Sequence, residues 1–189
     1  TVELAVKTYI PVRTAADFLA IGANNAAMAK KYMLMNDIDF EGATVNALSS
    51  YDSRNTQSFN GVFDGNNCSI RGLVINNNTQ SSGVFGAVGE KGVIKNLSVY
   101  GSVSSTSTYV AGVVAYNQGT VENCTNYATV SADSYFVGGV VAYNEKNVGK
   151  IFECVNYGTV TGKSDGTGGV VGCNKFNLSG CVNYGSVNG

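Results

Sequence analysis

The stretch Gly138-Gly139-Val140-Val141-Ala142-Tyr143-Asn144 (GGVVAYN) decides the fold, because the chain contains close copies of it on either side. AGVVAYN occupies 111–117 and TGGVVGCN occupies 167–174. Short β-branched runs bounded by Gly and Asn, without a 3.6-residue period, indicate strands rather than helices. Three near-identical strands at wide spacing indicate a repeat protein.

The glycine before each apolar pair sets the period of the repeat. These glycines are separated by steps of 22, 29, 27 and 30 residues, and they are Gly61, Gly83, Gly112, Gly139 and Gly169. A unit of this length made of short strands fits one coil of a parallel β-helix with three strands and three turns, in which equivalent residues stack about 4.8 Å apart. Parallel crossovers are right-handed. We therefore predict an all-β, right-handed parallel β-helix of about five coils.

A second anchor later in each repeat aligns like residues in columns. The column members are Leu73, Leu97, Cys124, Cys154 and Cys181, then Tyr100, Tyr127, Tyr157 and Tyr184, then Val103, Val130, Val160 and Val187. Because Leu residues continue the Cys column, we interpret its Cys124, Cys154 and Cys181 as small buried hydrophobic side chains with free thiols.

The first anchor predicts a structural Asn ladder. Phe63 and Phe85 align with the Val residues of the later copies, and the polar column that follows is Asn66, Asn117, Asn144 and Asn174. We expect these Asn residues to sit in tight turns in the left-handed region. Stacked amides would then exchange hydrogen bonds from coil to coil.

Composition narrows the function. The 189 residues contain 12 basic and 13 acidic side chains, so a nucleic-acid partner is not expected. His is absent, which excludes Ser-His-Asp catalysis and His-ligated metals. No apolar run reaches the ~20 residues of a membrane span, and the chain opens on TVELAVKTYI, so we expect an extracellular, secreted or cell-surface segment of a longer protein.

Residues 1–57 differ in composition from the repeats at 58–189, because they contain most of the helix-forming residues of the chain. Thr14 and Asp17 form a capping-box pattern ahead of Phe18, Leu19 and Ile21, which predicts a short amphipathic helix. An open solenoid end exposes backbone and apolar interior to other chains. We therefore predict an N-terminal helical cap on one continuous β-helix domain.

Three segments and the later repeats together resemble a known family. The segments are Asn36-Asp37-Ile38-Asp39-Phe40, Phe59-Asn60-Gly61-Val62-Phe63-Asp64-Gly65 and Ile94-Lys95-Asn96-Leu97. The repeats after 110 are similar to the GLUG motif of bacterial cell-surface and secreted proteins, with Val in place of the motif's Leu. The resemblance implies a pectate-lyase-like β-helix that serves as a stalk, spacer or binding surface, and it supplies no shared catalytic residue.

Acidic residues are the candidates for chemistry. Asp37 and Asp39 flank Ile38 and would point the same way from a strand, as paired carboxylates do in a glycosidase or lyase site. The alternative is that both cap turns or bond to the N-terminal helix. Asp64 precedes Gly65, which suits a turn, and a Ca²⁺ site is the alternative. The lysines are scattered among turns, without acidic residues at the matching positions of neighbouring coils. This pattern disfavours the Ca²⁺ and Lys or Arg site of a β-helix polysaccharide lyase. We predict no metal and no cofactor.

Two outward rows are candidates for binding. The Tyr100, Tyr127, Tyr157 and Tyr184 column would either present aromatic rings to glycans or seal one coil against the next. Hydroxyl pairs flank the Val column at Ser102/Ser104, Thr129/Ser131 and Thr159/Thr161, with Ser186/Asn188 less regular, and they suit solvated strand positions better than an ice-binding array.

The sequence thus favours a non-catalytic adhesion or scaffold module of a bacterial surface protein, whose partners would be host or bacterial glycans or surface proteins. A carbohydrate-binding or carbohydrate-processing β-helix is the alternative, so enzymatic activity stays open.

Overall fold

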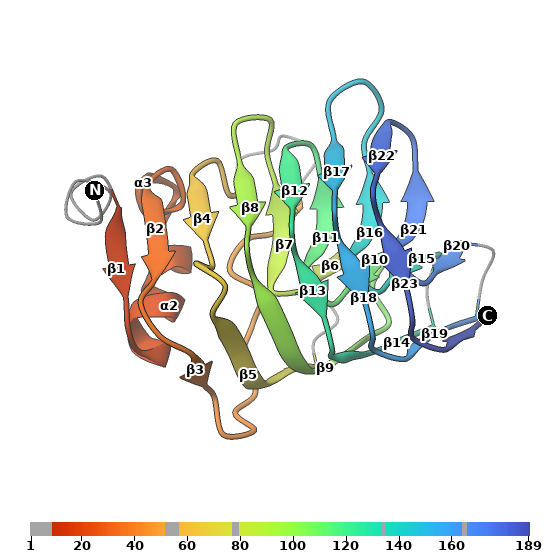
Figure 1. Ribbon diagram of the computed structural model, residues 1–189, viewed down its shortest axis with the longest axis horizontal. Helices are drawn as coiled ribbons and strands as arrows, with labels where there is room; N and C mark the ends of the chain where they lie inside the picture. The colour runs from red at the N-terminus through yellow and green to blue at the C-terminus, as the bar shows by residue number, and fades with distance from the viewer. Residues whose placement is uncertain (1–8, 52–56, 77–79, 134, 164–165) are drawn as a thin grey trace.

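The computed structural model describes residues 9–51, 57–76, 80–133, 135–163 and 166–189. It is an all-β solenoid of about five coils, as predicted, and every strand pairing within these residues is parallel (Figure 1). Each complete coil from β4 onward passes through four sheets, here called A, B, D and C in the order in which the chain meets them.

Sheets A and B form two of the walls. Sheet A consists of β1 (Ile10–Val12), β2 (Lys31–Leu34), β4 (Val62–Asp64), β8 (Val93–Lys95), β12 (Thr120–Glu122), β17 (Lys150–Phe152) and β22 (Asn177–Ser179). Sheet B consists of β3 (Ile38–Asp39), β5 (Ser69–Asn76), β9 (Ser98–Ser105), β13 (Thr125–Asn126), β14 (Thr129–Ala132), β18 (Val155–Asn156), β19 (Val160–Gly162), β23 (Val182–Asn183) and β24 (Val187–Asn188).

The other two walls are shorter, with four strands each. Sheet D consists of β6 (Ser81–Ser82), β10 (Tyr109–Ala111), β15 (Phe136–Gly138) and β20 (Gly166–Gly168). Sheet C consists of β7 (Phe85–Val88), β11 (Val114–Asn117), β16 (Val141–Asn144) and β21 (Val171–Asn174). The expectation of three strands per coil is wrong, because a bend at Gly139 and Val140 divides one expected strand into β15 and β16.

The first repeat also has a different register from the one predicted. Phe63 on β4 pairs with Ile94 in sheet A, whereas Phe85 on β7 pairs with Val114 in sheet C. The glycine-aromatic pattern therefore occurs in two different sheets. The sequence-based alignment of the repeats had placed Phe63 and Phe85 in a single column. For the same reason Asn66 lies outside the Asn ladder, and it donates from Nδ2 to the carbonyl of Leu34 (3.2 Å).

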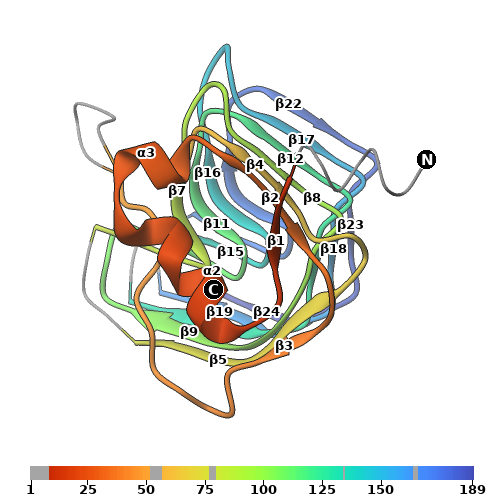
Figure 2. The ribbon, with the colours of Figure 1, turned by 90° about the vertical axis from the view of Figure 1, so that its left-hand side faces the viewer.

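Short helices cover the N-terminal end of the coil, as predicted. The sequence forms α2 (Ala15–Ala20), the 3₁₀ turn η1 (Ile21–Ala23) and α3 (Asn25–Met28), which lie in front of the coil in the end-on view (Figure 2). Thr14 Oγ1 accepts from Asp17 N (3.1 Å), and the Asp17 carboxylate accepts from Thr14 N (3.1 Å), which completes a capping box. The hydrogen bond that Arg13 N donates to the Asp17 carboxylate, followed by the bonds with Thr14, holds the pKa of Asp17 below its usual value.

Phe18 joins this cap to the solenoid core. Its ring meets Phe40, Phe63 and Phe85 edge to face, with ring centroids 5.9, 5.6 and 6.4 Å apart. Edge-to-face pairs stabilise beyond their buried area. The helix thus closes the apolar interior with one inserted aromatic ring, while its neighbour Leu19 stays 41% exposed.

We predict that Phe18→Ala lowers the free energy of unfolding by about 3–5 kcal/mol, because it leaves a cavity beneath the cap. Leu19→Ala, the matched control in the same helix, should cost less than about 1 kcal/mol because that side chain already contacts water. Urea denaturation followed by circular dichroism measures both. Equal costs for the two variants would show that Phe18 does not anchor the cap.

Candidate functional site

The Tyr column forms a continuous stack outside sheet B. Ring centroids are 4.4 Å apart between Tyr100 and Tyr127, 4.9 Å between Tyr127 and Tyr157 and 5.0 Å between Tyr157 and Tyr184. The interplanar angles are 3°, 4° and 15°. Arg71 Cζ lies 4.9 Å from the Tyr100 centroid and covers that end of the stack by a cation–π contact.

Face-to-face stacking decides what these rings present to a ligand. Tyr127 and Tyr157 have a neighbouring ring on both faces, so their edges and hydroxyls are what solvent reaches. They are nonetheless 40% and 48% exposed. Burial raises the pKa of the Tyr127 hydroxyl, with a smaller contribution from Tyr100, so this hydroxyl is uncharged at neutral pH. The column is therefore a ridge of ring edges rather than a flat aromatic platform.

The predicted Asn residues of sheet C lie in a hydrogen-bonded ladder. Asn117 Nδ2 donates to Asn144 Oδ1 (2.8 Å), and Asn144 Nδ2 donates to Asn174 Oδ1 (2.7 Å). Asn117 also closes its own turn, because Asn117 Oδ1 accepts from Gly119 N (3.1 Å). Of the four predicted Asn residues, Asn66 has a left-handed backbone, with φ of 52°, whereas Asn117, Asn144 and Asn174 do not. Other left-handed positions include Asn96 and Asn123, with φ of 54° and 48°.

A second buried ladder runs along sheet B, and the sequence reasoning missed it. Asn126 Nδ2 donates to Asn156 Oδ1 and Asn156 Nδ2 donates to Asn183 Oδ1, both at 2.8 Å. Asn156 also accepts from Gly158 N (3.2 Å) and donates to Gly158 O (2.8 Å). The signal was present, because each Asn lies two residues after a column Cys and so faces the same side of the strand.

This second ladder explains the glycine that opens each GVV. A Cβ placed on Gly139 would lie 2.4 Å from Asn156 Cγ, and one on Gly169 would lie 2.3 Å from Asn183 Cγ. On Gly112 it would lie 2.1 Å from Asn126 Oδ1. The glycine and the Asn are therefore one structural unit, although 14 or 17 residues separate them in the chain.

The column cysteines lie in the same interior. All five cysteines are free thiols, and Cys124 and Cys154 have no exposed surface. Cys154 N donates to Cys181 Sγ (3.4 Å), while the thiol of Cys154 donates to the carbonyl of Phe152 (3.2 Å). The neighbouring thiol of Cys124, and then burial, raise the pKa of Cys154, so it is protonated.

Each candidate Asp is engaged in a structural interaction. Asp37 Oδ1 accepts from Ser69 N (2.8 Å) and Asp37 Oδ2 lies 3.2 Å from Arg71 Nη2, and the backbone bond is the leading cause that lowers the pKa of Asp37. Asp39 Oδ1 accepts from Glu41 N (2.8 Å).

Asp64 belongs to β4 in sheet A and is 7% exposed. Its Oδ1 accepts from Asn66 N and from Asn96 Nδ2 (2.9 Å each), and its Oδ2 lies 3.4 Å from Lys95 Nζ. Within the described ranges no three Cys, Asp or Glu side chains gather at metal-binding distance.

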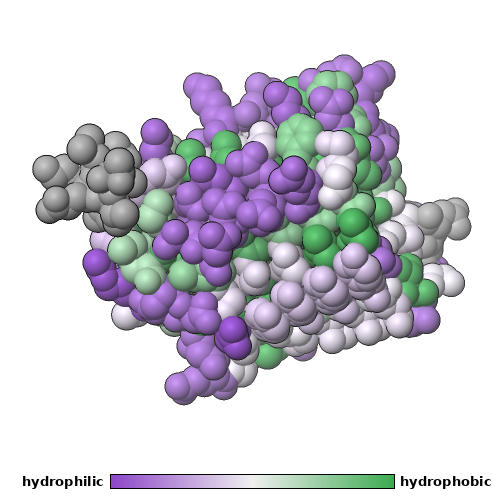
Figure 3. Space-filling model, viewed as in Figure 1, coloured by the Kyte–Doolittle hydropathy of each residue, from purple (hydrophilic) through white to green (hydrophobic). Residues whose placement is uncertain are grey.

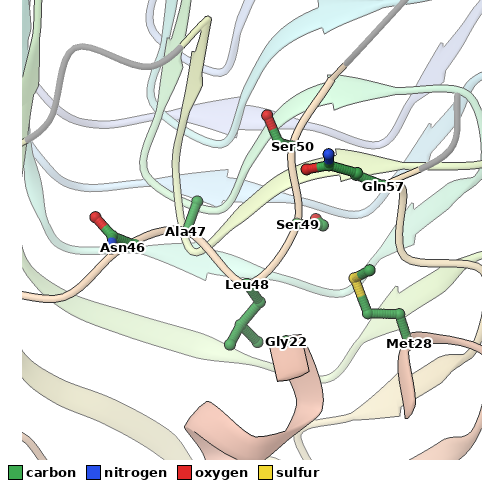
Figure 4. Close-up of a pocket in the computed structure, with 8 residues that line it drawn as sticks. All are labelled: Gly22, Met28, Asn46, Ala47, Leu48, Ser49, Ser50 and Gln57. Carbon is green, nitrogen blue, oxygen red and sulfur yellow. The ribbon is translucent and has the colours of Figure 1, made fainter. Parts of the chain in front are cut away.

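A hollow of about 170 Å³ lies beside the end of the cap (Figure 4). Its lining residues are Gly22, Met28, Asn46, Ala47, Leu48, Ser49, Ser50 and Gln57, none of which is ionisable. Ser49 Oγ donates to Ala87 O (2.7 Å) and accepts from Ala87 N (3.0 Å), so its hydroxyl is committed to the backbone. Among the described residues that line the hollow, no acid or base is present that could activate a serine hydroxyl.

An aromatic cluster separate from the main core was not foreseen. Tyr116 and Tyr143 from sheet C stack at 5.2 Å, and Tyr109 and Phe136 from sheet D stack at 5.8 Å. Tyr51 covers Tyr116 at a centroid distance of 4.0 Å. Burial, followed by the hydrogen bond that Tyr116 donates to the Glu145 carboxylate, raises the pKa of Tyr116. Sheets C and D had to be placed before this cluster could be seen.

The fold is shared with a known structure. A proposed immunoglobulin A1 protease from Bacteroides ovatus superposes with a TM-score of 0.74 over 95% of this chain, at 19% sequence identity. The chain spans 58% of that protein, and at this identity the likeness shows the fold alone.

Sequence comparison gives a more limited likeness. Halomucin of Haloquadratum walsbyi is 36% identical over 104 residues, which is 53% of this chain and 1% of halomucin. No protein-family model matches the chain. No helix in the described part of the chain is long and apolar enough to cross a membrane.

We predict that Asn156→Ala lowers the free energy of unfolding by about 2 kcal/mol or more, because it leaves a buried Asn126 N–H and the Gly158 amide groups without this partner. Asn183→Ala, in the same motif of the exposed last coil, should cost less than about 1 kcal/mol. Urea denaturation measures the difference. Equal costs would mean that burial of the ladder does not matter.

We also predict that iodoacetamide at pH 8 leaves Cys124 and Cys154 unmodified in the folded protein and modifies the more exposed Cys173. All five thiols should react after unfolding in urea. Peptide mass spectrometry identifies the modified sites. Alkylation of native Cys154 at the rate of Cys173, or a disulfide between column cysteines, would contradict the assignment.

Proposed function

We propose that this chain is a non-catalytic adhesion or scaffold module on the outside of a bacterial cell. The observation that carries the proposal is that the candidate reactive groups are committed to the structure. Asp37, Asp39 and Asp64 all accept backbone N–H groups, and the column thiols donate to carbonyls. Groups used in this way hold the solenoid together rather than attack a substrate.

The mechanical properties of the coil support a scaffold role. Two buried Asn ladders, the column cysteines and the Tyr stack all run along the solenoid axis, and each links a coil to the next. Nearest-neighbour coupling of this kind makes a repeat protein stiff along its length and leaves its outer faces free to vary. A stiff spacer with variable faces suits the presentation of a binding surface away from a cell.

The bacterial surface assignment is supported by resemblance. The segments at 36–40 and 59–65 and the repeats after 110 resemble GLUG-motif domains, and the fold is that of the Bacteroides ovatus protein. The description of that protein names a protease, and the chain spans only 58% of it. We propose that any proteolytic activity of a parent protein would reside outside this module.

Carbohydrate processing is the weaker alternative. A glycosidase or lyase needs carboxylates that can reach a substrate, whereas the Asp37 carboxylate pairs with Arg71 and Ser69 N. Carbohydrate recognition without cleavage is compatible with the module and is developed below for one face.

The proposal predicts that antibodies against the chain label intact cells of the source bacterium as strongly as permeabilised cells. Incubation of the purified chain with pectate, xylan or mannan should release no new reducing ends. Labelling that requires permeabilisation would overturn the surface location. Release of reducing ends that is lost in Asp37→Asn would restore the enzymatic alternative.

A further inference from the structure

We propose that the outer face of sheet B binds a neutral polysaccharide; the proposal rests on the extracellular role above and names its ligand class. The face consists of four rows that run along the solenoid axis. The rows are Ser98, Thr125, Val155 and Val182; Tyr100, Tyr127, Tyr157 and Tyr184; Ser102, Thr129, Thr159 and Ser186; and Ser104, Ser131, Thr161 and Asn188. We call this surface the sheet-B face.

Charge selects the class of ligand. None of the sixteen side chains of the sheet-B face is acidic or basic. Charged groups stand at its margins, where Lys163 Nζ meets Asp133 Oδ2 (2.8 Å) beyond the hydroxyl rows and Arg71 covers the first Tyr. In the space-filling view the face appears as a pale area over β9 and β14, below strongly hydrophilic side chains (Figure 3). An ionic polymer would lose hydration here without gaining a counter-charge, whereas a neutral polymer would not.

The relief of the face suits a chain of sugars. The Tyr ridge stands beside a row of short hydroxyl side chains, in which Thr129 and Thr159 are exposed. The ridge supplies apolar ring edges with a hydroxyl at each tip, and the row beside it supplies donors and acceptors. A sugar likewise carries apolar C–H groups and hydroxyls, so both kinds of group on the ligand find a partner on the same face.

Stacking prepares the face for binding. The rings of Tyr127 and Tyr157 are held 4.9 Å apart and 4° from parallel before any ligand arrives. Side chains that are already ordered lose little conformational freedom on binding, so less of the contact energy is spent on ordering them. The ridge is therefore a preorganised surface, in contrast to a row of separate exposed tyrosines.

The repeat of the face selects a polymer over a single sugar. Equivalent residues recur once per coil, about 4.8 Å apart, so a chain laid along the axis meets the same kinds of group at each coil. Each coil offers a weak contact, and several contacts on one ligand add avidity. We therefore expect soluble monosaccharides to compete poorly with the polymer.

The test is affinity electrophoresis of the intact chain in native gels that contain xyloglucan, galactomannan or mixed-linkage β-glucan, with pectate as the anionic probe. At least one neutral polymer should retard the chain, and pectate should not. Thr159→Lys places a charge in the middle of the sheet-B face and should weaken retention about tenfold or more. Ser179→Lys is the control, because it adds the same charge at an exposed Ser of β22 in sheet A and should bind as the parent does.

Tyr157→Ala tests the ridge independently. It interrupts the stack between Tyr127 and Tyr184 and should weaken retention about tenfold, while circular dichroism confirms that the coil stays folded. The proposal is overturned if no neutral polymer retards the chain. It is also overturned if Thr159→Lys and Ser179→Lys bind equally, or if pectate binds and Thr159→Lys strengthens its binding. These outcomes leave the surface location untouched, whereas labelling only of permeabilised cells would remove the proposed function and leave the binding result standing.

Discussion

The buried amide of each Asn is the constraint on which the solenoid depends. Asn117, Asn126, Asn144 and Asn156 are completely buried, so their donors and acceptors need partners inside the protein. Each finds one partner in its own turn and one in the Asn of the next coil. The second bond exists only if the next coil carries the same residue at the same height, so the ladders fix the register of sheets B and C.

The ladders also explain why the repeat is regular in space and irregular in length. Asn117 closes a turn onto Gly119, two residues later, whereas Asn144 reaches Gly149 O (3.2 Å), five residues later. The residues inserted after Asn144 lengthen one turn and leave the Asn144–Asn174 bond intact. Loop length costs little once the ends are fixed, which is why copies spaced by 27 and 30 residues stack in the same register.

The sequence predicted the parts of the fold that repeat along one sheet. It did not predict the contacts between residues of different sheets. The Cys, Tyr and Val columns could be read because they recur at one spacing and alternate across one strand. The Asn126 ladder was readable by the same alternation, because Asn126 lies two residues after Cys124 on the same strand. The contact between Gly139 and Asn156 joins sheets that no local pattern connects, and so does the packing of Tyr109 against Tyr116.

The same in-register stacking of coils determines both the interior and the surface of this protein, although different residues are stacked in each. In-register coils place identical residues above one another, which satisfies amides in the interior and stacks rings on the surface. The interior cannot change without breaking a ladder, because Asn156 touches both the next coil and the space that Gly139 leaves empty. The side chain of an outward residue such as Thr159 is not held by a ladder of this kind, since its neighbours are solvent and similar residues of the adjacent coils. The fold therefore confines variation to rows on the exterior, and any selectivity of the module has to be expressed there as a repeated pattern rather than as a single pocket.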